Sequence, residues 1–475
     1  MVKFTWGRRL SRQVGMLLCA IAFTAGGLYP ELRMAKRDCA MQTATLVKDP
    51  SCRGMQSTDD IETFQAPMDR TSYLQYARSI LGNHDFRYWG ANIWPPAFPL
   101  LVAAELKLLG TDLKDSRYQL HMACVAAVLW AAAFWLWFNA LLPLGLWRFA
   151  SGLVFLLPTF REWTLAGGAL TSESLSLALL FSTLGMLLLA LQRRRLGLFV
   201  AAALFIAASG YARGVLSAIW EGVLLGLLVC CGLYGAIRFL AESARHSGVP
   251  LGGWAMTFMR RELRRPYSRA IGVVTLMLVT VEAGLFPWKH HMAAQGTYQM
   301  TASAKFEIEA YMWSPSLPGF VVTGNTPCVV DPALCKAIVL SPELSTYPNK
   351  KRLALATFLN RPGPWIHRKV LALDQLWFGA SIRSTDPWEV AENVGYPVLY
   401  LLGMSMLAFR ARRSRACTLA LLTGGFFLLG NAAVFTMMHF EYRYGLPLKL
   451  FAFCLPWAAW ALSRLHEPLP AVTPT

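Results

Sequence analysis

One short stretch of the chain combines an acid with tyrosines at helical spacing. Asp69, Tyr73 and Tyr76 are four and three residues apart, so a helix would carry all three on one stripe. A carboxylate there could take the proton of an acceptor hydroxyl, because general-base catalysis needs a carboxylate within hydrogen-bond reach of that proton. The same pattern also fits an acid that is favoured by the dipole at a helix N-terminus. Spacing alone supports both interpretations equally.

Three further motifs place ionisable residues beside apolar runs. Glu173 follows Thr and Ser at the start of such a run, where it either stabilises the first helical turn or contributes to a substrate or metal site. Arg213 separates two apolar runs, where it either extends to the lipid headgroups or binds an anion. Glu441, Arg443 and Tyr444 connect the last two runs. Charges there are costly unless they are paired, and an arginine can hold a phosphate through two hydrogen bonds.

These motifs belong to a strongly apolar chain. Of 475 residues, 55% are hydrophobic and 15% are charged, and the mean hydropathy is +0.40. This exceeds what a soluble core requires and predicts an all-α polytopic membrane protein. The net charge of +18 does not indicate a nucleic-acid partner, because the basic residues form short runs between apolar segments, as cytoplasmic loops do. The main runs lie at residues 193–195, 260–265 and 410–415.

A membrane-spanning helix needs about twenty mostly apolar residues. Residues 95–110 are short and contain three prolines, so we expect an interfacial helix there, with both chain termini cytoplasmic. The first apolar run could also be a cleaved signal peptide, but no small-x-small site follows it closely, which favours an uncleaved helix. The ten predicted spans are 14–29, 118–142, 145–160, 173–191, 196–210, 214–239, 270–287, 394–409, 416–437 and 445–463.

The predicted spans divide the chain into five parts. These are a first span with a cytoplasmic N-terminus (1–30), a periplasmic loop with juxtamembrane helices (31–117), a transmembrane bundle (118–287), a small periplasmic subdomain (288–393), and the last spans with a cytoplasmic tail (394–475). Each outer part contains a close pair of cysteines, which predicts two disulfides. The alternative is four free thiols on a cytosolic side. The four residues are Cys39, Cys52, Cys328 and Cys335.

The order of the motifs resembles the GT-C superfamily of glycosyltransferases, most closely its ArnT-like and protein O-mannosyltransferase-like members. The shared residues are Asp69, Tyr73, Ala77 and Gly82, then Pro95-Pro96, Glu173 and Arg213, and finally Arg443, Tyr444 and Pro447. The resemblance implies transfer of a sugar, with inversion, from a polyprenyl-phosphate donor to a lipid, glycan or protein. The reaction would take place on the periplasmic face of a bacterial inner membrane. Nucleotide sugars are absent there, so no nucleotide-binding motif is expected.

The resemblance also implies roles for individual residues. Asp69 would be the catalytic base and Glu173 a second catalytic carboxylate, and these two would ligate a divalent metal ion if the enzyme uses one. The residues expected to bind the donor phosphate are Arg213, Arg443 and Tyr444, and those expected to contact the substrates are Tyr73, Trp94 and Glu441.

The sequence departs from the family pattern at two positions. Arg70 stands where an acid often follows the first Asp, and Trp94 stands where ArnT-like members have a lysine, so the donor sugar and the metal requirement stay open. A transporter or flippase of lipid-linked sugars is an alternative from another class, although no repeated half is evident. A ligase or polymerase of lipid-linked glycans is a third possibility, and it differs mainly in its acceptor.

Overall fold

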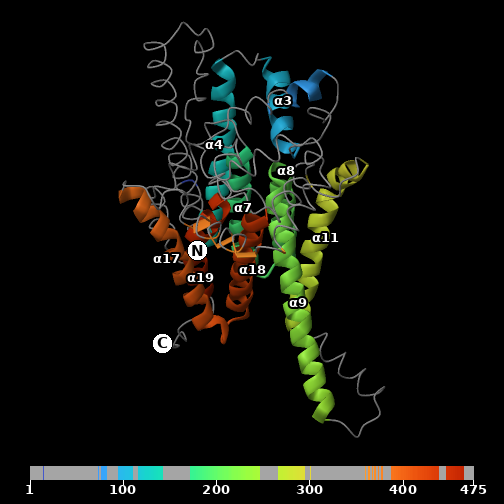
Figure 1. The fold of residues 1–475 in the computed structure, drawn as a ribbon, viewed down its shortest axis with the longest axis vertical. Coiled ribbons are helices and arrows are strands. Elements are labelled where there is room, and N and C mark those ends of the chain that lie inside the picture. The colour runs from blue at the N-terminus through green and yellow to red at the C-terminus, as the bar shows by residue number, and fades with distance from the viewer. Residues whose placement is uncertain are drawn as a thin grey trace, which may run out of the picture.

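The computed structural model describes most of the apolar helices of the chain (Figure 1). The described residues are Val14, 73, 76–82, 95–110, 116–142, 172–245, 266–294, 300, nine positions between 359 and 377, 387–437 and 445–464. Within these ranges the regular secondary structure is entirely helical. The helices are α3 (Ala97–Leu109), α4 (Ser116–Leu141), α7 (Ser172–Arg193), α8 (Leu196–Ala212), α9 (Gly214–Arg245), α11 (Pro266–Ala293), α17 (Pro387–Ala411), α18 (Arg415–Met437) and α19 (Leu446–Arg464).

Six stretches are long and apolar enough to cross a membrane. They are Ser172–Arg193, Gly214–Ile237, Ser268–Ala293, Val394–Ala411, Arg415–Thr436 and Leu446–Arg464. Two shorter apolar stretches, Val128–Leu141 in α4 and Leu196–Ala212 in α8, add to them. The protein is therefore a polytopic membrane protein whose described part is all helical.

The predicted spans are reproduced in part. Six coincide with the six long apolar helices, and the predicted spans 118–142 and 196–210 coincide with α4 and α8. The predicted spans 14–29 and 145–160 lie outside the described residues, except for Val14. The described residues therefore support a polytopic helical protein without establishing a count of ten spans.

Helix α3 is too short to be one of the spans. It has 13 residues, which corresponds to a length of about 20 Å, against about 30 Å for the hydrocarbon core of a bilayer. It begins after Pro96 and ends at Gly110, which adopts a left-handed φ of 60° that glycine tolerates better than other residues. Its length agrees with the prediction that residues 95–110 do not span.

The two ends of the helical bundle differ in charge. Gln192 donates a hydrogen bond to the carbonyl of Ala140 at 2.8 Å, so α4 and α7 end at the same side. The α7–α8 and α17–α18 turns also belong to this side, which we call the arginine end. We call the opposite side, with the start of α7 and the α8–α9 turn, the site end. The described arginines of the arginine end are Arg193, Arg194, Arg195, Arg269, Arg410, Arg412, Arg413, Arg415 and Arg464.

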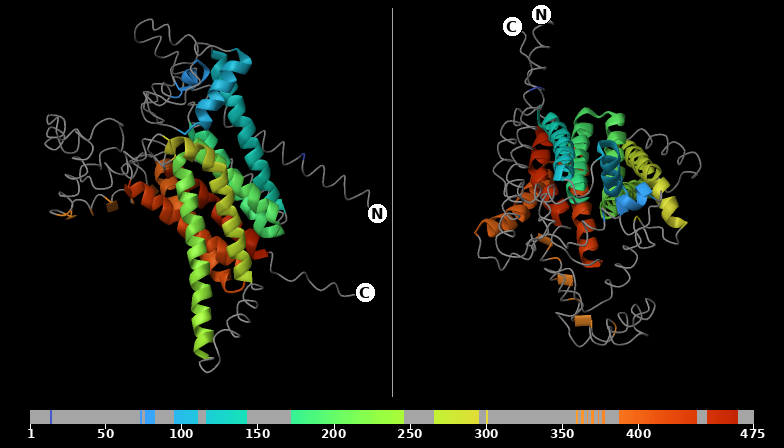
Figure 2. Two further views of the ribbon diagram at one scale, coloured as in Figure 1. Left: turned by 90° about the vertical axis from the view of Figure 1, so that its right-hand side faces the viewer. Right: turned by 90° about the horizontal axis from the view of Figure 1, so that it is seen from above.

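Helix α7 occupies the centre of the bundle, where it contacts α4, α8 and α19. Close approach depends on glycines: a Cβ on Gly185 would lie 3.1 Å from the backbone nitrogen of Trp137, and one on Gly403 would lie 2.9 Å from the carbonyl carbon of Leu455. Helix α9 has 32 residues, about 48 Å, and extends beyond its neighbours at the arginine end (Figure 2). The packed core of the bundle therefore holds the start of α7 in a fixed place at the site end.

Candidate functional site

A buried ion pair joins the start of α7 to the turn between α8 and α9. Nη1 of Arg213 lies 2.8 Å from Oε1 of Glu173, and the two side chains are 12% and 4% exposed. Glu173 is in the first turn of α7, where the helix dipole favours a negative charge. The pair is therefore held at the site end of the bundle, largely shielded from solvent.

The backbone at Arg213 is extended, and this is why α8 and α9 are separate helices. Its φ and ψ are −149° and 107°, while its N–H donates to the carbonyl of Ser209 at 2.7 Å and its own carbonyl accepts from the N–H of Leu216 at 3.0 Å. Both backbone groups of Arg213 are thus bonded although the residue lies outside the two helices. These hydrogen bonds fix the backbone from which the Arg213 side chain extends.

The helix that includes Tyr73 docks beside this ion pair. The hydroxyl groups of Tyr73 and Ser172 are 2.9 Å apart and hydrogen-bonded. The Tyr73 ring is 4% exposed and meets the Phe98 ring of α3 edge to face, with ring centroids 4.9 Å apart. Leu175 of α7 packs against the same small apolar cluster. The residue next to Glu173 therefore ties the start of α7 to two helices from the first predicted outer segment.

The other hydroxyls at the start of α7 are also bonded. Ser174 accepts a hydrogen bond from the Trp130 indole at 2.9 Å, and Ser176 donates to the Glu173 carbonyl at 2.8 Å. These buried hydroxyls orient the first turn of α7. Glu173 therefore sits on a rigid element, as a catalytic or binding site requires.

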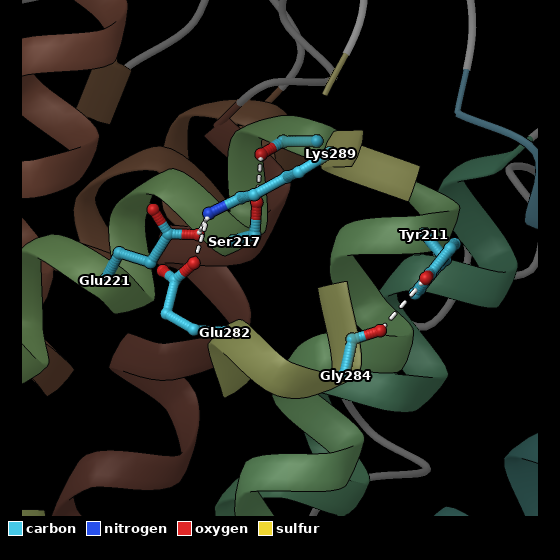
Figure 3. Close-up of polar contacts among 7 residues, drawn as sticks. Tyr211, Ser217, Glu221, Glu282, Gly284 and Lys289 are labelled. Carbon is cyan, nitrogen blue, oxygen red and sulfur yellow. Dashed lines mark hydrogen bonds and ion pairs between the residues drawn. The ribbon is translucent and has the colours of Figure 1, made fainter. Parts of the chain in front are cut away.

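A second polar cluster lies in α9 and α11, and sequence reasoning missed it (Figure 3). Nζ of Lys289 lies 3.0 Å from Oε1 of Glu221 and 2.8 Å from Oε2 of Glu282. We refer to these three residues as the ion triad. Ionisable side chains inside apolar runs were the available signal, because such residues are costly in a membrane unless paired.

Two further lysines lie near the ends of α18 and α19; the sequence indicated Lys369 only as part of the basic start of an interfacial helix, and it gave no sign of Lys449. Lys449 is only 1% exposed, and its ammonium lies 5.4 Å from the centre of the Tyr396 ring. Lys369 donates a hydrogen bond to the carbonyl of Thr436 at the end of α18. Burial lowers the pKa of Lys369 to about 8. One buried cation thus lies near the start of α19, and a second lies at the end of α18.

Of the predicted site residues, the structure describes Tyr73, Glu173 and Arg213, and it brings them together through Ser172. The catalytic candidate Asp69 lies outside the described residues, four positions before Tyr73. The other predicted residues outside them are Trp94, Glu441, Arg443, Tyr444, Cys39, Cys52, Cys328 and Cys335. Cys230, Cys231, Cys417 and Cys454 are free thiols.

The described residues do not form an evident metal site. Within those ranges no group of three or more His, Cys, Asp or Glu side chains is arranged to hold a metal ion. The Glu173 carboxylate already pairs with Arg213, a partner that a cation would have to displace. The geometry therefore favours a paired anion and cation at this position over a metal ligand.

The chain was compared with models of protein families, with curated proteins and with solved structures, and none of the three comparisons found a match.

Proposed function

We propose that the protein is an integral-membrane glycosyltransferase that moves a sugar from a polyprenyl-phosphate donor to a lipid, glycan or protein acceptor. The observation that carries the proposal is the buried Glu173–Arg213 pair beside the docked Tyr73. It supplies an acid, a phosphate-binding cation and the helix that follows Asp69 at one end of a membrane bundle. Such a combination suits chemistry on a lipid-linked phosphate.

The charge asymmetry of the bundle supports a periplasmic site. Basic residues collect in cytoplasmic loops, so we assign the arginine end to the cytoplasm of a bacterial inner membrane. Helix α11 ends and α17 begins at the site end, which therefore receives both ends of the segment between them. Lipid-linked donors are the sugar donors that this face of the membrane offers.

The ion pair also indicates different roles for the two carboxylates, Asp69 and Glu173. Because Arg213 occupies Oε1 of Glu173, we assign the proton transfer to Asp69 and the holding of the arginine to Glu173. The acceptor oxygen attacks the anomeric carbon while the bond from that carbon to the phosphate oxygen breaks, which inverts the configuration. The hydroxyl proton passes to the Asp69 carboxylate, and the bonding electrons leave with the lipid phosphate. Arg213 and Arg443 stabilise the charge that develops on this phosphate.

The test begins with identification of the acceptor. The masses of lipopolysaccharide, membrane lipids and periplasmic proteins are compared between cells with and without the protein, and a missing hexose- or pentose-sized addition identifies the acceptor. Asp69→Asn should then abolish this addition while the protein still inserts into the membrane. Asp60→Asn, a matched change in the same segment, should leave it intact.

Two outcomes would overturn the proposal. Full transfer by Asp69→Asn would remove the catalytic assignment. Movement of lipid-linked sugar across reconstituted vesicles, with no acceptor modified, would instead identify a flippase.

A further inference from the structure

The turn that carries Arg213 is held from both sides by the last third of α11. Helix α8 reaches the turn from one side and α9 leaves it on the other, and neither helix includes Arg213. In this part of α11, Gly284 contacts α8 and Lys289 contacts α9 (Figure 3). The position of the guanidinium therefore depends on how firmly α11 holds its two neighbours.

On the α8 side, the link is short and closely packed. The Tyr211 hydroxyl, two residues before Arg213, donates to the carbonyl of Gly284 at 2.9 Å. A Cβ on Gly284 would lie 2.9 Å from the Cβ of Ala207, so α8 and α11 approach as closely as a glycine allows. This contact fixes the end of α8.

On the α9 side, the link is ionic. Glu221 lies eight residues after Arg213, about 12 Å along the helix, and accepts a hydrogen bond from Lys289 of α11 at 3.0 Å. Lys289 also donates to Glu282, which belongs to α11 itself, at 2.8 Å. The Glu221 contact therefore joins two helices, whereas the Glu282 contact lies within one.

A third contact involves the residue directly after Arg213. A Cβ on Gly214 would lie 2.6 Å from the Cβ of Met300, so only glycine fits there without a shift. The carbonyl of Met300 accepts a hydrogen bond from the indole of Trp288, the residue before Lys289, at 2.8 Å. Both Trp288 and Met300 are 6% exposed. The segment around Lys289 thus abuts the Arg213 turn as well as α9.

We propose that Lys289 is a positioning residue: its ion pair with Glu221 keeps the start of α9 against α11, and this keeps Arg213 in reach of Glu173. Within the described residues Lys289 pairs with Glu221 and Glu282, whereas Arg213 pairs with Glu173, so Lys289 acts on the ion pair through the turn. The inference rests on the proposed function only in what it takes the Glu173–Arg213 pair to do, namely to bind the donor phosphate. The existence and control of that pair can be tested without any substrate.

The experiment is a mutant cycle on the purified full-length protein in detergent, read as the thermal unfolding midpoint. Glu173→Gln, Arg213→Gln and the double variant measure the coupling between these two residues. The same cycle is then repeated in a Lys289→Met background. We expect a clear coupling in the native background and loss of most of it in Lys289→Met, because Arg213 no longer reaches Glu173 in a fixed geometry.

Two comparisons separate positioning from general destabilisation. Glu221→Gln should also abolish the coupling, whereas Glu282→Gln should largely keep it, because only Glu221 links the two helices. Lys449→Met removes another buried cation, distant in the chain from the turn, and should lower the midpoint without changing the coupling. Lys289→Arg should retain the coupling, because it keeps a cation at this position. If Lys289→Met does not fold, the comparison of Lys289→Arg with Glu221→Gln tests the same inference.

The inference is overturned if the native background shows no coupling, or if the coupling survives unchanged in Lys289→Met or Glu221→Gln. A protein that transfers no sugar but shows the expected loss of coupling would overturn the proposed function and leave this inference standing.

Discussion

Glu173 and Arg213 share one ion pair, whereas the sequence suggests a separate task for each. An arginine that is already bonded to a carboxylate can bind a phosphate only by sharing or exchanging that partner. Phosphate offers the guanidinium the same planar, two-point contact that a carboxylate does. The pair therefore sets how readily a lipid phosphate gains access to Arg213.

Binding of a polyprenyl phosphate without a sugar tests this competition. Arg213→Gln should weaken binding by about tenfold or more, because hydrogen bonds to charged groups contribute about 1.5–3 kcal/mol. Glu173→Gln should strengthen binding, because the arginine loses its competing anion. Titration of the purified protein with undecaprenyl phosphate, followed by tryptophan fluorescence, measures both. Equal affinity of Glu173→Gln and the native protein would show that the two anions do not compete.

Lys369 allows a prediction about pH at the same scale. Its pKa is about 8 in the folded protein because it is buried, against about 10.5 for an ordinary lysine. Between these values the unfolded chain binds the proton and the folded protein does not, so stability rises with pH across this window. Below about pH 8 both states are charged and this contribution stays constant. The unfolding midpoint should therefore rise more between pH 7.5 and 9.5 in the native protein than in Lys369→Met. An equal rise in both proteins would contradict this prediction.

At the scale of elements, the outer helices matter because they dock onto α7. Tyr73 reaches Ser172 and packs against Phe98, so one residue connects three helices. The catalytic candidate Asp69 precedes Tyr73 by one helical turn if that helix continues. The docking therefore determines how well a carboxylate on this segment can be placed relative to Arg213.

The Tyr73–Ser172 hydrogen bond should contribute about 1 kcal/mol to stability. Tyr73→Phe and Ser172→Ala should each lower the free energy of unfolding by about that amount, and the double variant should lose little more than either one. Both single variants should also reduce sugar transfer without abolishing it. Unfolding and transfer assays on the three variants check this, and strictly additive losses would show that the bond contributes nothing in the membrane.

The elements were easier to predict from the sequence than the contacts between them. Long apolar runs identify α7, α9, α11, α17, α18 and α19, because a run of about twenty apolar residues matches the length of a membrane-spanning helix. The partnership of Lys289 with Glu221 could not be predicted, because it depends on which faces of α9 and α11 meet. The burial of Lys449 could not be predicted either, because it depends on how α19 packs against Tyr396 of α17. Glu173 and Arg213 were expected at the same end of the bundle, but their direct bond depends on the extended turn at Arg213.

At the scale of the whole molecule, the clustering of arginines at the arginine end is the feature that most constrains the orientation of the protein in the membrane. The described turns at 193–195 and 412–415 and the end of α19 carry several arginines, all on the side opposite Glu173. Lys and Arg beside short loops strongly favour retention in the cytoplasm. The cluster therefore predicts the direction in which every described helix crosses.

Reporter fusions in a bacterial host test that orientation directly. Alkaline phosphatase, which is active only outside the cytoplasm, should be active when fused after Gly110 or Ala294, because these positions belong to the site end. It should be inactive after Arg194, Arg413 or Arg464, where a fluorescent protein that folds only in the cytoplasm should instead be bright. Replacing Arg193, Arg194 and Arg195 by Gln should weaken the retention of that turn and raise the phosphatase activity of the Arg194 fusion, because the orientation depends on these charges. Phosphatase activity at the arginine end of the unaltered chain would instead place Glu173 and Arg213 on the cytoplasmic side. Nucleotide sugars are available there, so the argument for a lipid-linked sugar donor would no longer hold.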